Sequence, residues 1–166
     1  MHVCALVENL TPGILKLNLA SQEVTDEHVH TLVSRCIKLT ELDLSFTEIT
    51  NGSVESIMKH LNSLEKLDVR YTKIDFSSLL QLKSIPTLKS LRFGRSTLGQ
   101  SKEYTETIQE AIKETTKNMK LQLPHISINE EYTNIASPSK CVNESVDLDW
   151  FWEIKAMKQQ LFRKTF

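Results

Sequence analysis

The 166-residue sequence predicts an α/β fold in which short parallel strands form a curved sheet and helices cover its outer side. One observation is a pattern of apolar residues that recurs four times along the chain. Its central leucines are Leu17, Leu42, Leu67 and Leu91, with steps of 25, 25 and 24 residues between them. The other observation is the spacing of the apolar residues, which alternates around each of these leucines and then changes to the three-and-four spacing of a helix.

A repeat of this length, with one strand and one helix in each unit, is typical of leucine-rich repeats. A single unit cannot bury its apolar side, so neighbouring units stack and share a continuous core. We therefore predict a leucine-rich-repeat solenoid over residues 1–128 and an irregular C-terminal tail over residues 129–166. Strands are expected at residues 16–20, 41–45, 66–70 and 90–94, each with one face in the core and one in solvent.

Three helices are expected between these strands. Thr25 can cap the first helix, and Asn51 or Ser53 can cap the second. Pro86 ends the third, because proline cannot continue a helix. The expected buried residues are Val29, Leu32, Val33 and Cys36 in the first helix, Val54, Ile57, Met58 and Leu61 in the second, and Ile74, Leu79, Leu80 and Leu82 in the third.

A longer helix is expected at residues 101–120, before a fifth strand. Its outer face is polar, as the terminal cap of a solenoid should be. The buried side of this helix is expected to contain Ile108, Ala111, Ile112, Thr115 and Met119, and the fifth strand is marked by Leu123, Ile126 and Ile128.

Both ends of the chain depart from the repeat. Residues 3–10 resemble the second half of a repeat helix with no polar cap before it, so we expect an apolar edge that an upstream region or a partner covers. At the other end, the polar stretch 130–149 precedes three consecutive aromatic residues at 150–152, which a disordered tail rarely carries. We expect the tail to fold back on the concave face, with docking contacts from Tyr132, Ile135, Trp152 and Ile154.

Composition narrows the classes of function. The hydrophobic fraction of 40% can supply a core, and the net charge of −1 indicates neither nucleic acid nor an anionic membrane as a partner. No apolar run approaches the length of about 18 residues that a membrane span needs. The three cysteines are odd in number and widely spaced, which argues against a disulfide framework and for a soluble intracellular protein.

The solvent-facing strand positions and the residues just after them are the candidate partner-binding site. We expect Glu41 to lie beside Lys66, and Phe46 to lie beside Tyr71 at one rim of the sheet. Aromatic side chains at a rim are natural interface anchors. Two alternatives stay open: the charges can simply solvate the face, and the two aromatics can pack beneath the returning tail. The predicted partner-binding residues are Glu41, Asp43, Ser45, Phe46, Lys66, Asp68, Arg70, Tyr71 and Arg92.

No pattern indicates an active site. Cys36 lies on an apolar stripe, and Cys141 lies in the polar tail with no histidine near it in the sequence that could activate it as a nucleophile. His28 and His30 are two positions apart on a helix and diverge, which does not suit a metal site. The four glycines form no phosphate-binding loop. We therefore predict no enzyme activity, no cofactor and no bound metal.

Several segments resemble the F-box proteins with leucine-rich repeats, which are substrate receptors of cullin-type (SCF) ubiquitin ligases. Residues 35–39, Arg-Cys-Ile-Lys-Leu, look like the cysteine-containing repeats of that family. Residues 85–91 and 123–129 are similar to its last regular repeat and final strand, and residues 132–138 and 152–155 are similar to its tail. These segments occur in the same order in the family and together span nearly the whole chain.

The resemblance implies a substrate-recognition module of the ubiquitin pathway that binds a protein substrate or adaptor. It also implies a role in the cell cycle, a nuclear and cytoplasmic location and a monomeric state. The chain carries no F-box, so a scaffold or competitor that does not deliver substrates, or a non-autonomous fragment, stays open. The family contacts a small cyclin-kinase-subunit protein through an acidic and a basic residue after successive strands; this sequence has Phe46 and Tyr71 there instead.

Overall fold

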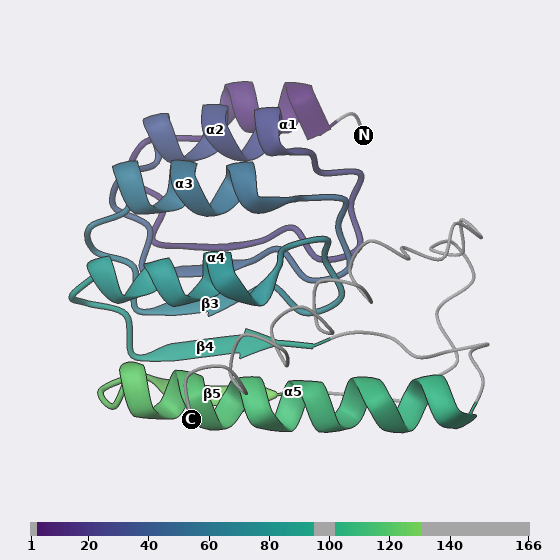
Figure 1. Cartoon of the computed structure of the whole chain (residues 1–166). Helices are drawn as coiled ribbons and strands as arrows, with labels where there is room; N and C mark the ends of the chain where they lie inside the picture. The colour runs from purple at the N-terminus through teal and green to yellow at the C-terminus, as the bar shows by residue number, and fades with distance from the viewer. Residues whose placement is uncertain (1–2, 95–101, 131–166) are drawn as a thin grey trace. The chain divides into compact units, whose positions relative to one another are not determined.

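The computed structural model describes residues 3–94 and 102–130. Five parallel strands form one sheet in the order β1-β2-β3-β4-β5, so each strand pairs with the next one along the chain (Figure 1). The register places Leu17, Leu42, Leu67, Leu91 and Ile128 in one row across the sheet. The strands are β1 (Lys16–Asn18), β2 (Glu41–Asp43), β3 (Lys66–Asp68), β4 (Ser90–Phe93) and β5 (Ser127–Glu130). The predicted α/β solenoid of leucine-rich repeats is confirmed.

The first three strands end two residues earlier than predicted, because a side chain turns the chain out of the strand. Oδ1 of Asn18, Asp43 and Asp68 accepts a hydrogen bond from the backbone N–H two residues later, at 2.8, 3.0 and 3.1 Å. Asparagine and aspartate form such turns readily, since their short side chains mimic a backbone carbonyl. In β4 the equivalent residue is Arg92, which cannot accept this bond, and the strand continues to Phe93.

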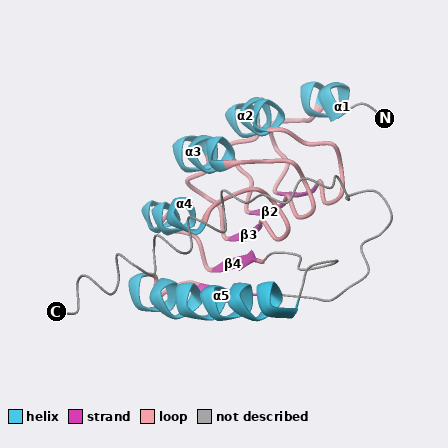
Figure 2. Ribbon diagram, turned by 45° about the vertical axis from the view of Figure 1, so that its right-hand side comes forward, coloured by secondary structure: helices cyan, strands magenta, loops and turns pink. Residues whose placement is uncertain are grey.

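The helices form a row on one side of the strands (Figure 2). None of the helices in the described residues is long and apolar enough to cross a membrane. They are α1 (Val3–Asn9), α2 (Asp26–Arg35), α3 (Asn51–His60), α4 (Phe76–Leu80) with the short 3-10 helix η1 (Gln81–Ser84), and α5 (Lys102–Gln122).

The core lies between the sheet and the helices and repeats from unit to unit. Leu19, Leu44, Val69 and Phe93 occupy equivalent positions and are all at most 3% exposed. Fully burying one such side chain contributes about 1.5–3 kcal/mol, so the stacked rows account for the stability of the repeat. Leu17 at the edge strand β1 is only half-buried, whereas Leu42, Leu67 and Leu91 are fully buried.

Most of the predicted helix residues are buried, with three corrections. Met58 and Leu80 are half-buried rather than buried, because they lie at the border of the apolar stripe. On α5 the buried threonine is Thr116 and not Thr115. Thr116 continues the helical spacing from Ile112, and its hydroxyl donates to the carbonyl oxygen of Ile112 at 2.8 Å, which satisfies the buried polar group. The side chain of Ile108 lies outside the described atoms.

Capping hydrogen bonds join the start of α2 to the start of α3, and the start of α3 to the start of α4. Thr25 precedes α2 as predicted, but the residue that precedes α3 is Thr50, so the prediction of Asn51 or Ser53 is wrong. The carboxylate of Asp26 accepts from the backbone N–H groups of Thr50 and Ser53, at 2.8 and 3.2 Å, and from both hydroxyl groups. Thr50 is therefore fixed as the cap by an acid from the preceding repeat.

Asp75 caps its own helix, α4. Its Oδ1 accepts from the backbone N–H of Ser78 at 2.7 Å, and the amide of Asn51 bonds both its side chain and its backbone N–H. Partial burial alone would raise the pKa values of Asp26 and Asp75, but the surrounding hydrogen bonds outweigh it and lower both. We call Asp26, Thr50, Asn51, Ser53 and Asp75 the cap ladder.

Candidate functional site

The sheet surface opposite the helices is lined by alternating strand residues, which we call the sheet face. Parallel pairing places Glu41 opposite Lys66, as expected, and Asp68 opposite Arg92. The members of the sheet face are Lys16, Asn18, Glu41, Asp43, Lys66, Asp68, Ser90 and Arg92.

One row of the sheet face is a chain of exposed ion pairs. Oε1 of Glu41 lies 3.0 Å from Nζ of Lys16 and 3.0 Å from Nζ of Lys66. Hydrogen bonds from Lys16 and Lys66 lower the pKa of Glu41. Because all three groups are in solvent, these pairs add little to stability. They give this row a net positive charge.

The next row contains a rigid charged cluster. Asp68 is only 7% exposed, and its carboxylate accepts from Nε and Nη2 of Arg70 at 2.8–3.0 Å. A nitrogen of Arg92 lies 3.4 Å from the same carboxylate. The hydrogen bonds to Asp68 raise the pKa of Arg70. Two arginines are therefore held in place around one nearly buried acid.

Asp43 is the acid of the preceding repeat, and its surroundings differ. Its Oδ1 accepts from the N–H and the hydroxyl of Ser45, at 3.0 and 2.7 Å. Its side chain is half-exposed, and within residues 3–94 and 102–130 no Lys, Arg or His nitrogen lies within ion-pair distance of it. Its register neighbour on β1 is the neutral Asn18. Asp43 therefore offers negative charge to the solvent.

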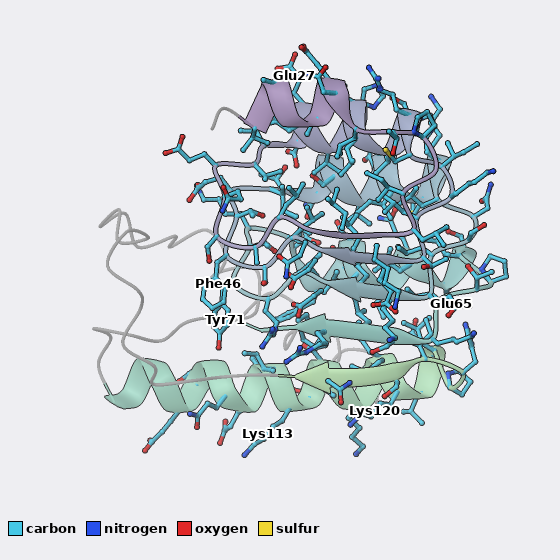
Figure 3. The ribbon with its side chains drawn as sticks, turned by 180° about the vertical axis from the view of Figure 1, so that it is seen from behind. Glu27, Phe46, Glu65, Tyr71, Lys113 and Lys120 are labelled. Atoms are coloured by element: carbon cyan, nitrogen blue, oxygen red, sulfur yellow. The ribbon has the colours of Figure 1, made fainter. Side chains whose placement is uncertain are left out.

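Phe46 and Tyr71 form a stacked pair at the edge where the strands end, which we call the aromatic rim. Their ring centroids are 4.4 Å apart and the ring planes are inclined by 24°. Figure 3 shows the two rings one above the other, with Glu65 at the opposite edge of the sheet. The expected adjacency of these two residues is confirmed. Stacking of this kind adds about 0.5–1.5 kcal/mol beyond the burial of the rings.

The backbone that carries the aromatic rim is unusual. Ser21, Phe46 and Tyr71 occupy equivalent points of three repeats, and their φ angles are 59°, 58° and 58°. Each donates its N–H to a carbonyl oxygen of the next repeat, namely that of Ser45, Arg70 and Gly94, at 2.8–2.9 Å. The left-handed conformation therefore belongs to the geometry of the repeat.

Holding a non-glycine residue in this conformation costs on the order of 1–3 kcal/mol, and for a bulky side chain it is rare. Glycine would adopt it without this cost. Ser21 shows that the turn also forms with a small residue. The turn therefore does not require the aromatic side chains of Phe46 and Tyr71, and such strain is commonly found at functional sites.

Two features were not found from the sequence. The first feature is Asp26, which bonds the start of the helix in the next repeat. The residues of a single repeat do not indicate this contact. On the helix side, His60 meets His30 edge-to-face with ring centroids 5.9 Å apart. Its Nε2 is buried and has no hydrogen-bond partner among residues 3–94 and 102–130. Among the described residues no group of three or more potential metal-binding side chains comes together. The predicted tail contacts of Tyr132, Ile135, Trp152 and Ile154 lie outside the described residues.

A family model for the leucine-rich repeat matches residues 35–58, from the end of α2 through β2 and into α3. This chain carries a leucine-rich repeat. The match supports a protein-interaction module, because stacked repeats create extended binding surfaces and typically act in protein binding. No curated protein sequence matches the chain. The resemblance to F-box receptors stays a prediction from the sequence.

Proposed function

We propose that this protein is an interaction module that presents the sheet face and the aromatic rim to a protein partner. The observation that carries the proposal is the stacked pair of Phe46 and Tyr71, held at positive φ in a turn that a small residue also supports. The fold alone gives no reason to maintain two strained aromatic residues at adjacent repeats. Binding of a partner gives such a reason.

The geometry suits recognition in two ways. The rings are half-buried and braced against each other, so little side-chain freedom remains to be lost on binding. The arginines around Asp68 are likewise fixed before a partner arrives. Aromatic residues and arginines in such settings are the commonest energetic centres of protein interfaces.

We further propose a role similar to the substrate-recognition end of the S-phase kinase-associated F-box protein, a receptor of cullin-type ubiquitin ligases. The support is the resemblance of residues 85–91, 123–129 and 132–138, together with the leucine-rich-repeat match. With Phe46 and Tyr71 in place of an acid and a base, the rim would use aromatic contacts rather than ion pairs. A small cyclin-kinase-subunit protein is therefore not the partner we favour, and a scaffold or competitor that does not deliver substrates is the alternative.

Photocrosslinking from the rim tests the binding role. A photoreactive phenylalanine analogue at position 46 should crosslink one recurring protein in cells, and the Tyr71→Ser variant should lose that crosslink. The matched control carries the same analogue at the exposed Lys113 on α5 (Figure 3). Equal crosslinking from both positions would show that the rim is not the binding surface. Under the ligase reading, the captured protein should carry less ubiquitin when this chain is depleted; unchanged ubiquitin would favour the scaffold or competitor.

A further inference from the structure

The aromatic rim ends at the second repeat. Ser21 has the backbone geometry of Phe46 and Tyr71, with φ of 59° and an N–H donated to the next repeat at 2.9 Å, but it carries no ring. One face of the Phe46 ring is covered by Tyr71. Because the repeats stack in chain order and Tyr71 belongs to the following repeat, the other face of the ring lies on the side of the preceding repeat, where Ser21 is exposed. We call this place, where a third ring would stand, the slot.

An acid lies on the same strand-and-turn segment as the slot. The side chain of Asp43 folds back over the turn that carries Phe46, because its Oδ1 bonds the N–H and hydroxyl of Ser45. In the preceding repeat the equivalent residue is Asn18, which makes the same turn through Oδ1 without a charge. Arg70 contributes to the field around Asp43, but its guanidinium forms its close pair with Asp68. The Phe46 ring and the Asp43 carboxylate are thus three residues apart on one strand-and-turn segment, and both side chains are half-exposed.

We propose that the slot binds an arginine side chain of the protein partner. This inference rests on the proposed function and names the chemistry that the rim recognises. A guanidinium is planar, so it can lie on the open face of Phe46 as the next layer of the stack. From there its N–H groups can reach the carboxylate of Asp43, whose Oδ2 takes part in no hydrogen bond or ion pair within residues 3–94 and 102–130.

Other ligand chemistries fit the slot less well. A lysine ammonium is a compact charge that cannot stack as a plane, so it should bind more weakly than arginine. An acidic or phosphorylated segment would be repelled by Asp43. A neutral urea of the same shape, as in citrulline, would keep the stacking and lose the charge. These differences make small-molecule probes informative.

The first experiment is an NMR titration of the full 166-residue chain with the capped amino acid N-acetyl-arginine-N-methylamide. We expect shifts of the Phe46 ring signals and of the Ser45 amide, with saturation at millimolar concentrations. The matching lysine and citrulline derivatives should bind at least about threefold more weakly, in line with an exposed cation–π contact. Failure of arginine to bind the full chain, or equal binding of citrulline, would overturn the proposal.

The first repeat supplies the variants for the second experiment. Asp43→Asn copies Asn18 and keeps the turn, and Phe46→Ser copies Ser21 in the same backbone conformation. Ser21→Phe fills the slot with the ring that the repeat lacks. Each change should weaken arginine binding at least about threefold. Glu65→Gln, at the opposite edge of the sheet (Figure 3), is the control and should leave it unchanged.

The outcomes separate this inference from the proposed function. If the crosslink from position 46 recurs while the three slot variants bind arginine as the natural chain does, the slot inference is wrong and the interaction module stands. If the shifts map to the helices, or if a second copy of the chain occupies the slot and the Phe46 signals change with protein concentration alone, the slot is also excluded. Circular dichroism of each variant checks that the fold is intact.

Discussion

Asp26→Ala is the substitution for which the structure gives the clearest expectation. Asp26 is the first residue of α2, and its carboxylate receives two backbone N–H groups and two hydroxyl groups from the start of α3. Alanine removes all four bonds and leaves both helices otherwise unchanged. The variant therefore measures how strongly the cap ladder holds one repeat to the next.

The magnitude follows from what each group loses. Removing a capping side chain costs about 0.5–2 kcal/mol. Ser53 is fully buried, so its hydroxyl group is left without an acceptor, and such a group costs about 1–3 kcal/mol. Thr50 is exposed and can bond water instead, which reduces the total. We expect a loss of about 2–3 kcal/mol, a large fraction of the 5–15 kcal/mol typical of a folded domain.

Urea denaturation followed by circular dichroism at neutral pH measures this loss. The matched control is Glu27→Ala, the adjacent acid in the first turn of α2, which is exposed. That change removes only a favourable interaction with the helix dipole, worth about 0.3–1 kcal/mol. If Asp26→Ala destabilises the protein no more than Glu27→Ala does, the cap ladder does not link the repeats as we describe.

The effect of Asp26→Ala should depend on pH in a defined direction. The pKa of Asp26 is lowered in the folded state, so its carboxylate stabilises the fold above the unfolded value of about 3.9. This contribution is lost as the pH falls through the lower, folded value. The stability difference between the natural chain and the variant should therefore be constant from pH 7 to about 5 and shrink below about 4. A difference that stays constant down to pH 2–3 would show that the charge of Asp26 is not responsible.

Two further predictions come from the structure, and a third comes from the sequence of the tail. Ser21→Gly should raise the free energy of unfolding by about 0.5–1 kcal/mol, because relief of the left-handed strain exceeds the extra entropy of glycine in the unfolded chain. A lower free energy of unfolding in urea denaturation would contradict this. Leu67→Ala, in the centre of the sheet, should cost about 2–5 kcal/mol, and Leu17→Ala at the edge less than half as much; equal losses would count against the core described here. Trp152→Ala tests the predicted docking of the tail and should cost more than about 1 kcal/mol, whereas an unchanged denaturation midpoint would leave the tail as a free appendage.

The sequence was sufficient to predict the sheet, because burying one face of each strand and one stripe of each helix requires apolar residues at regular spacings, and these spacings are visible in the sequence. It also predicted that Phe46 and Tyr71 would be neighbours, since a constant repeat places equivalent residues side by side. It did not predict where strands end, which depends on a bond from the side chains of residues such as Asp43 to the backbone. The start of α3 was missed for a similar reason: Thr50, Asn51 and Ser53 can all act as caps, and an acid 24 residues upstream of Thr50 decides between them.

The strained backbone of the aromatic rim could not be predicted either. Positive φ is associated with glycine, asparagine and aspartate, and nothing in Phe46 or Tyr71 as residue types indicates it. The conformation is imposed by the turn, which donates each of these N–H groups to the next repeat. Phe46 and Tyr71 are therefore not residue types that favour the conformation of this turn.

Comparison of the first repeat with the next two separates the demands of the fold from those of function. Asn18 and Asp43 make the same turn, and Ser21 and Phe46 adopt the same φ, so one unfavourable conformation is common to both repeats. What differs is a negative charge and an aromatic ring, and neither is required by the bonds that shape the turn. Both differences fall on the same edge of the sheet, and both are half-exposed. A fold that needed only its core could carry asparagine and serine in every repeat, so the acid and the ring of the second repeat are best explained by a partner that contacts them.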